Sequence, residues 1–201
     1  MVLLALFALA WFAGLDYRDL IRPDEGRYAE IAREMVVSGD WLTPRLNGFK
    51  YFEKPALQYW ATAAAFSLFG VDAWTARLWT ALTGFLGVLL VHATGRRLFG
   101  PAEGLAAAAV AASSLLYVFM GHLNTLDMGL GFFLTLGICA FMAAQSDAAT
   151  EKQRRNAMWL AWAAIALAVL SKGLVALVLP GATVVAYVFW QRDWTLLRRL
   201  H

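Results

Sequence analysis

The sequence predicts an all-α integral membrane protein, a polytopic bundle of about six transmembrane helices at roughly 20 residues per crossing. The first observation is composition: 61% of the 201 residues are hydrophobic and 15% are charged. Soluble domains are about 45–50% apolar and about 25% charged. The second observation is that the apolar residues occur in long blocks, and that polar segments separate these blocks.

The first apolar block covers residues 2–15. It is shorter than the roughly 20 residues that cross a bilayer, so we expect either a start before Met1 or an extension toward Leu20. The block lacks a basic leader, and Asp16 and Arg18 follow it in place of a small-residue cleavage site. These features favour a retained membrane helix over a signal peptide.

Residues 16–72 form the predicted first loop, with two amphipathic helices at the membrane interface. Over residues 24–37, apolar side chains recur at helical spacing and charged ones cover the other face. Pro23 precedes this helix and Gly39 follows it, as is typical of helix boundaries. The second amphipathic segment covers residues 56–69, and both helices are of the kind that lies along an interface.

Further apolar blocks supply the remaining crossings, and no domain boundary separates them, so the whole chain (1–201) is predicted to be one domain. These blocks cover residues 73–91, 104–120, 128–144, 158–170 and 174–190.

Basic residues set the predicted orientation. If every block crosses, three clusters lie on one side, which the positive-inside rule makes cytoplasmic. These clusters are Arg96 and Arg97; Lys152, Arg154 and Arg155; and Arg192, Arg198 and Arg199. Residues 16–55, 124–127 and 171–173 then share the opposite, extracytoplasmic face. The net charge of +3 is explained by these clusters, so nucleic acid is excluded as the expected partner.

Asp24 and Glu25 are the candidate catalytic carboxylates of this face. A carboxylate at the start of an interfacial helix can accept a proton from a nucleophile within hydrogen-bond reach. The alternative is structural: Asp24 caps the helix, with salt bridges to Arg22 or Arg27.

Charged residues elsewhere on the same face have two interpretations each. Lys54 and Lys172 offer cations for a phosphate group, or they reach toward lipid headgroups. Asp127, at the start of a span, is either a site residue or a helix cap. Arg77 is a weaker candidate for the site, and its simpler role is to reach lipid headgroups. The isolated His92, His122 and His201 give no metal-ligand spacing.

Two motifs then resemble a known family. Residues 22–30 read RPDEGRYAE and residues 51–55 read YFEKP. They resemble the first extracytoplasmic loop of the GT-C membrane glycosyltransferases, in particular the bacterial lipid A aminoarabinose transferases and protein mannosyltransferases. Those loops carry a similar RPDE-x-RYAEI-x-REM run, then SGDW and YFEKP. The match is dense over residues 22–60. Family members usually continue with further helices, so the resemblance implies a GT-C-like N-terminal portion.

The resemblance also implies roles for individual residues. Asp24, assisted by Glu25, would act as the base, and Lys54 and Lys172 would bind the donor phosphate. Glu53 would orient Lys54 or bind a divalent metal. Asp127 and Arg27 would support the site.

The implied activity is that of an inverting glycosyltransferase. It would move a sugar from a polyprenyl-phosphate donor to a lipid A, protein or glycan acceptor, at the external face of the bacterial inner membrane among membrane lipids. A divalent metal is left open as a cofactor. The alternative is a polytopic transporter or a non-catalytic lipid-binding scaffold. Transporters hold substrate near the bilayer midplane, whereas these charges lie at the edges of loops.

Overall fold

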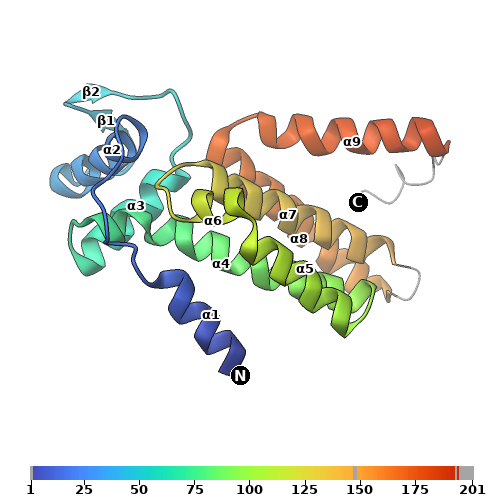
Figure 1. Ribbon diagram of the computed structural model, residues 1–201. Helices are drawn as coiled ribbons and strands as arrows, with labels where there is room; N and C mark the ends of the chain where they lie inside the picture. Colours follow the sequence, from blue (N-terminus) through green and yellow to red (C-terminus); the bar gives the residue numbers. More distant parts are fainter. Residues whose placement is uncertain (1, 147–148, 193, 195–201) are drawn as a thin grey trace. The chain divides into compact units, whose positions relative to one another are not determined.

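The computed structural model describes residues 2–146, 149–192 and 194, whose regular secondary structure is helical except for one small hairpin (Figure 1). The elements are α1 (Val2–Phe12), α2 (Asp24–Ser38), β1 (Arg45–Leu46), β2 (Phe49–Lys50), α3 (Leu57–Phe69), α4 (Ala73–Leu98), α5 (Pro101–Ser113), α6 (Leu115–Gly121), α7 (Asp127–Gln145), α8 (Glu151–Lys172) and α9 (Val175–Gln191). The chain divides into two compact units, the first ending at Gly129 and the second beginning at Leu130. The single domain over residues 1–201 stays a prediction.

The two predicted loop helices are present as α2 and α3. Helix α2 ends at Gly39, whose φ of 72° is left-handed and whose N–H donates to the carbonyl of Met35, because glycine adopts this conformation without steric cost. The apolar faces of the helices share a core that includes Ile31 of α2 and Tyr59 of α3. Helix α3 also packs against α4, so this loop is joined firmly to the first long helix.

A two-stranded antiparallel hairpin between α2 and α3 was not expected. Strands β1 and β2 pair Arg45 with Lys50 and Leu46 with Phe49. The connecting Asn47 and Gly48 have φ values of 52° and 80°, the two positive values that a type I′ turn requires. These few residues lie in the predicted polar loop, and Asn-Gly is the usual signal for such a turn.

Helix α4 is longer than the predicted block. Asp72 caps its start, since its carboxylate accepts from the N–H of Ala73 at 2.6 Å while its own N–H donates to Thr75 Oγ1 at 2.9 Å. Helix α5 packs beside α4 (Figure 1). Their contact is close at Gly104, where an added Cβ would lie 2.4 Å from the backbone nitrogen of Arg96. Only glycine therefore fits at this position.

The predicted span over residues 104–120 is broken. Helices α5 and α6 meet at Ser114 with a bend of 67°. Ser114 has an extended ψ of 118°, and the hydroxyl of Ser113 donates to the carbonyl of Ala109 at 2.7 Å, a side-chain bond that often bends helices. The bend brings α6 against α4, where Tyr117 donates to the carbonyl of Gly84 at 2.8 Å.

Helix α1 ends at Phe12, so the predicted extension toward Leu20 was wrong. Its buried Trp11 donates from Nε1 to the carbonyl of Ala81 in α4 at 2.8 Å. A Cβ on Gly84 would lie 2.8 Å from the Trp11 ring. This packing attaches the end of α1 to α4, and the following residues lead across the bundle to α2.

The second unit contains most of α7, with α8 and α9. Helix α8 begins seven residues before the predicted block, because Thr150 and Gln153 form a capping box that starts the helix inside the charged run. Gly173, with φ of 94°, separates α8 from α9. Asp147, Arg198 and Arg199, which belong to the predicted charged segments, lie outside the described residues.

By length and composition, α4 and α7 can each cross a membrane, and the bent α5–α6 pair is a broken span or a re-entrant loop. Among the described residues these are the helices that meet that test, while α1 and α9 are shorter apolar helices. A helical integral membrane fold is confirmed. The number of about six crossings stays a prediction.

Candidate functional site

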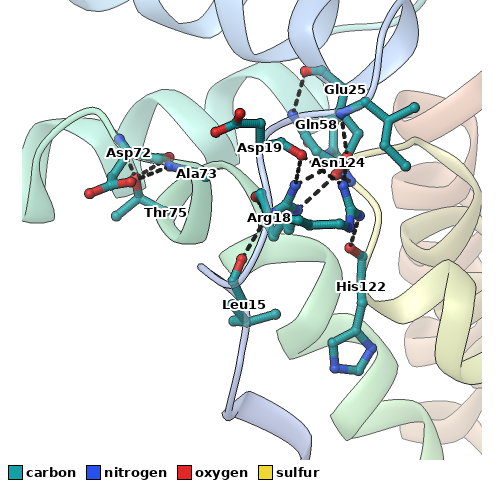
Figure 2. Close-up of polar contacts among 12 residues, drawn as sticks. Leu15, Arg18, Asp19, Glu25, Gln58, Asp72, Ala73, Thr75, His122 and Asn124 are labelled. Atoms are coloured by element: carbon teal, nitrogen blue, oxygen red, sulfur yellow. Dashed lines mark hydrogen bonds and ion pairs between the residues drawn. The ribbon is translucent and has the colours of Figure 1, made fainter.

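The site is built around Glu25 in the first turn of α2, inside the first unit (Figure 2). The side chain is 1% exposed. Its Oε1 accepts from Arg77 Nε at 2.9 Å and from the N–H of Asn124 at 2.8 Å. Its Oε2 accepts from Arg18 Nη1 at 2.6 Å, from the N–H of Ile21 at 2.9 Å and from Arg77 Nη2 at 3.2 Å. Glu25 is therefore a fully bonded, buried carboxylate.

Arg77 of α4 is the buried partner of this carboxylate. It is 1% exposed, and it also donates to the carbonyls of Leu15 at 2.6 Å, Arg18 at 3.0 Å and Asp19 at 3.0 Å. The expectation that Arg77 reaches lipid headgroups was wrong. The planar guanidinium can satisfy a carboxylate and several carbonyls at once, so it stays inside the protein.

The pKa of Glu25 shows which effect dominates. Burial acts to raise it, but hydrogen bonds from Arg77 and Arg18 and from the backbone N–H groups of Asn124 and Ile21 outweigh burial. Together they lower the pKa of Glu25 to about 2. The side chain is thus charged at neutral pH.

Asn124 connects this centre to α3 and to the turn before α7. Its side-chain oxygen accepts from Gln58 Nε2 at 2.8 Å, and its Nδ2 donates to the carbonyl of Glu25 at 3.3 Å. The carbonyl of the neighbouring His122 accepts from Arg18 Nη2 at 3.1 Å. The ring nitrogens of His122 lie 2.7 Å from the carbonyl oxygen of Val118 and 2.8 Å from that of Trp11, so the ring packs between α1 and α6.

Asp24, one residue earlier, has the opposite environment. Its side chain is 54% exposed and forms an ion pair with Arg27. The helix N-cap is Pro23, with no side-chain capping bond, so the cap interpretation of Asp24 was wrong and the alternative pairing with Arg27 is confirmed. The guanidinium of Arg27 also lies 5.4 Å from the centre of the Tyr28 ring.

Glu53 and Lys54 form the second part of the site. Lys54 Nζ lies 3.3 Å from Glu53 Oε1, and Tyr51 donates from its hydroxyl to Glu53 Oε2 at 2.7 Å. The bond from Tyr51, followed by Lys54, lowers the pKa of Glu53. Burial and the bond to Glu53 raise the pKa of Tyr51 to about 12. Lys54 is thus paired with a carboxylate that also accepts a hydrogen bond from a tyrosine.

Tyr28 lies near the acidic residues of both parts. Burial raises its pKa most, the charges of Asp24, Glu53 and Asp127 raise it further, and Arg27 opposes them. The charges of three predicted acidic residues, which come from α2, the segment after β2 and the start of α7, therefore all act on Tyr28.

A group of tyrosines was missed. The ring of Tyr59 lies 6.0 Å from that of Tyr28 and 6.5 Å from that of Tyr51, centre to centre. Tyr59 is buried and its hydroxyl has no hydrogen-bond partner in the described part of the chain. Two of these tyrosines belong to the two sequence motifs, so the motifs themselves contained this signal.

The remaining predicted residue, Lys172, is the last residue of α8 in the second unit. Its partnership with Lys54 at a phosphate stays a prediction. Residues 2–146, 149–192 and 194 contain no group of three or more His, Cys, Asp and Glu side chains arranged to hold a metal ion. A divalent metal at Glu53 also stays a prediction.

Comparisons with known proteins agree with the motifs. The family model described as dolichyl-phosphate-mannose-protein mannosyltransferase matches residues 1–201. The undecaprenyl phosphate-alpha-4-amino-4-deoxy-L-arabinose arabinosyl transferase of Edwardsiella ictaluri is 35% identical over 193 residues, covering 96% of this chain and 35% of that protein. The transferase of the same name from Shewanella sediminis is 36% identical over 187 residues, covering 93% and 34%.

Two crystal structures of ArnT from Cupriavidus metallidurans match the whole chain. The apo structure has a TM-score of 0.91 at 45% identity, and the structure bound to undecaprenyl phosphate has a TM-score of 0.92 at 44% identity. The chain spans 37% of each of those chains, and thus about a third of the length of its relatives. The resemblance in the loop motifs is confirmed, and the chain belongs to the dolichyl-phosphate-mannose-protein mannosyltransferase family.

Proposed function

We propose that the chain forms part of an inverting glycosyltransferase that moves a sugar from a polyprenyl-phosphate donor to a lipid A, protein or glycan acceptor. The observation that carries this proposal is a chain of contacts that connects Asp24 to the Glu53–Lys54 pair. Asp24 pairs with Arg27, which lies over Tyr28, and Tyr51 bonds to Glu53; the rings of Tyr28 and Tyr51 both lie beside the ring of Tyr59. A base and a phosphate-binding cation are the two groups that the transfer needs. The relatives are named as transferases, and one solved relative binds undecaprenyl phosphate.

Asp24 is the proposed base. Its exposed carboxylate can meet an acceptor from the aqueous side, and it forms an ion pair with Arg27. As the acceptor oxygen attacks the anomeric carbon, the bond from that carbon to the phosphate oxygen breaks and its electron pair leaves with the polyprenyl phosphate. Asp24 takes the acceptor's proton. Attack opposite the leaving group inverts the anomeric configuration.

Lys54 is the proposed contact for the departing phosphate, because a positioned ammonium stabilises charge as it develops there. Glu53 orients this ammonium through their 3.3 Å contact. Lys172 is proposed as a second phosphate contact, and Asp127 as a supporting carboxylate. If a divalent metal binds, Glu53 is its proposed ligand, and the metal would supply further positive charge to the phosphate.

The positive-inside rule places this site on the extracytoplasmic face, which we propose is the external face of a bacterial inner membrane. No observation favours the transporter or scaffold alternative.

The test is a transfer assay in membranes that contain the full chain. A radiolabelled polyprenyl-phosphate sugar and the same sugar as a nucleotide derivative are compared as donors, and the anomeric configuration of the product is determined by NMR. Transfer from the lipid donor alone, with inversion, supports the proposal. Transfer from the nucleotide sugar, or retention of configuration, contradicts it.

A further inference from the structure

Four chain segments of the first unit meet at the carboxylate of Glu25, and a fifth is linked to them through Asn124. Arg77 comes from α4, Arg18 from the segment after α1, Asn124 from the turn before α7, and Gln58 of α3 joins through Asn124. Glu25 itself belongs to α2. In the Arg18–Glu25 pair and in the four ion pairs that do not involve Glu25, at least one side chain is 21% exposed or more, whereas Arg77 and Glu25 are 1% and 2% exposed.

The hydrogen bonds to Glu25 occupy the lone pairs that would accept a proton from a substrate. A carboxylate offers about four lone-pair positions, and five hydrogen bonds already reach its two oxygens. Its pKa of about 2 makes it a poor proton acceptor at neutral pH. Asp24, by contrast, has one ion-pair partner and an exposed carboxylate.

The position of Glu25 links two residues of the proposed site. It directly follows Asp24, and its Oε1 accepts from the backbone N–H of Asn124, three residues before Asp127. Asn124 in turn donates from its side chain to the carbonyl of Glu25. Two hydrogen bonds therefore join the start of α2 to the turn before α7. In each of them a side chain of one segment bonds to a backbone group of the other.

We propose that the buried Glu25–Arg77 pair, together with Asn124, is a positioning device that sets the place of Asp24 relative to Asp127. This inference rests on the proposed function. In it Glu25 does not react with the substrates, but holds Asp24 and Asp127 in position. Displacement of a catalytic group by about 1 Å can cost about 100-fold in rate. Loss of the pair therefore lowers turnover more than it weakens donor binding.

The test uses full-chain variants in detergent and membranes. Arg77→Lys keeps the charge and loses the fork of donors, while Glu25→Gln keeps one acceptor oxygen and loses the charge. Glu30→Gln is the matched control, because Glu30 lies on the same helix and pairs with Arg33 at a part-exposed site. Each protein is measured for kcat, for KM of the lipid-linked donor, for its pH–rate profile and for amide hydrogen exchange.

We expect kcat to fall about 10- to 100-fold in Arg77→Lys and Glu25→Gln, with KM for the donor changed less than about twofold because binding is separate from alignment. The acid limb of the pH–rate profile stays in place, since Glu25 is not the base. In Glu25→Gln the amides of Ile21 and Asn124 exchange faster by about tenfold or more, because the carboxylate that accepts from both is replaced by an amide with one acceptor oxygen. Glu30→Gln changes none of these.

The outcomes separate the two proposals. A wild-type protein that transfers no sugar contradicts the proposed function and, with it, the role of the pair in the reaction. If the wild type is active, unchanged exchange at Asn124 or unchanged kcat overturns the positioning role. Loss of the acid limb in Glu25→Gln overturns it too, and makes Glu25 the base. If Glu25→Gln fails to fold, Arg77→Lys and Glu25→Asp provide the same measurements.

Discussion

Glu25 and Arg77, 52 residues apart in the chain, form a two-point ion pair inside the first unit, with Nε 2.9 Å from Oε1 and Nη2 3.2 Å from Oε2. Both side chains are at most 2% exposed. Removal of one partner of such a pair leaves the other charge buried and uncompensated. The pair therefore makes the loop containing the proposed site dependent on α4.

Arg77→Gln is expected to lower the free energy of unfolding by about 3–5 kcal/mol. The carboxylate of Glu25 and the carbonyls of Leu15 and Asp19 lose the hydrogen bonds that the guanidinium of Arg77 donates. Thermal unfolding in detergent measures the change. Arg33→Gln, which removes a part-exposed pair with Glu30, is the control and should cost about 0–1 kcal/mol. Equal losses in the two variants would show that Arg77 is not buried as described.

Glu25 also predicts how stability depends on pH. Its pKa falls from an ordinary 4.5 to about 2 on folding, so its contribution is complete above pH 4.5 and is lost as the pH falls toward 2. The shift corresponds to about 3 kcal/mol. Wild type and Glu25→Gln are compared by thermal unfolding from pH 6 to pH 2.5. The stability difference between them should shrink over this range, and a constant difference would contradict the assignment.

The contact between α4 and α5 predicts an unusual cost for a single methyl group. In Gly104→Ala the new Cβ meets the backbone of Arg96, so the helices must separate, at a cost of about 1–3 kcal/mol. Gly131→Ala, in α7, has open space around it and is expected to be neutral or stabilising by up to about 1 kcal/mol. Unfolding midpoints in detergent measure both, and a neutral Gly104→Ala would contradict the close contact.

Lys54→Ala is expected to weaken binding of a polyprenyl phosphate about 10- to 100-fold, because one charge-assisted contact is worth about 1.5–3 kcal/mol. Lys50→Ala is the control, since Lys50 is an exposed lysine of β2 in the same loop. Equilibrium binding in detergent gives both dissociation constants. If the two variants bind equally well, Lys54 only reaches lipid headgroups.

The sequence predicted local structure correctly where the residues that determine it lie within a few positions of one another. The bounds of α2 followed from its apolar period, from Pro23 and from Gly39, all of which act within a few residues. The Asn47-Gly48 turn had an equally local signal that was overlooked. The break at Ser114 was missed because the apolar pattern continues through it, and only the backbone geometry reveals the bend.

The role of Arg77 could not be read from the sequence, because its partners are a carboxylate 52 residues away and three backbone carbonyls. No spacing rule identifies carbonyl acceptors of that kind. The sequence also could not show which of the two neighbouring acids, Asp24 and Glu25, is buried and which is exposed. The helix turns one toward solvent and the other into the protein, and that difference gives them different proposed roles.

The most direct measurement is sugar transfer by Asp24→Asn beside the wild type, with radiolabelled polyprenyl-phosphate sugar as donor. We predict that kcat falls about 10²- to 10⁴-fold, the usual contribution of a general base, while the variant binds the donor as tightly as wild type does. Transfer that survives the substitution at near wild-type rate would contradict the account and reduce Asp24 to an ion-pair partner of Arg27.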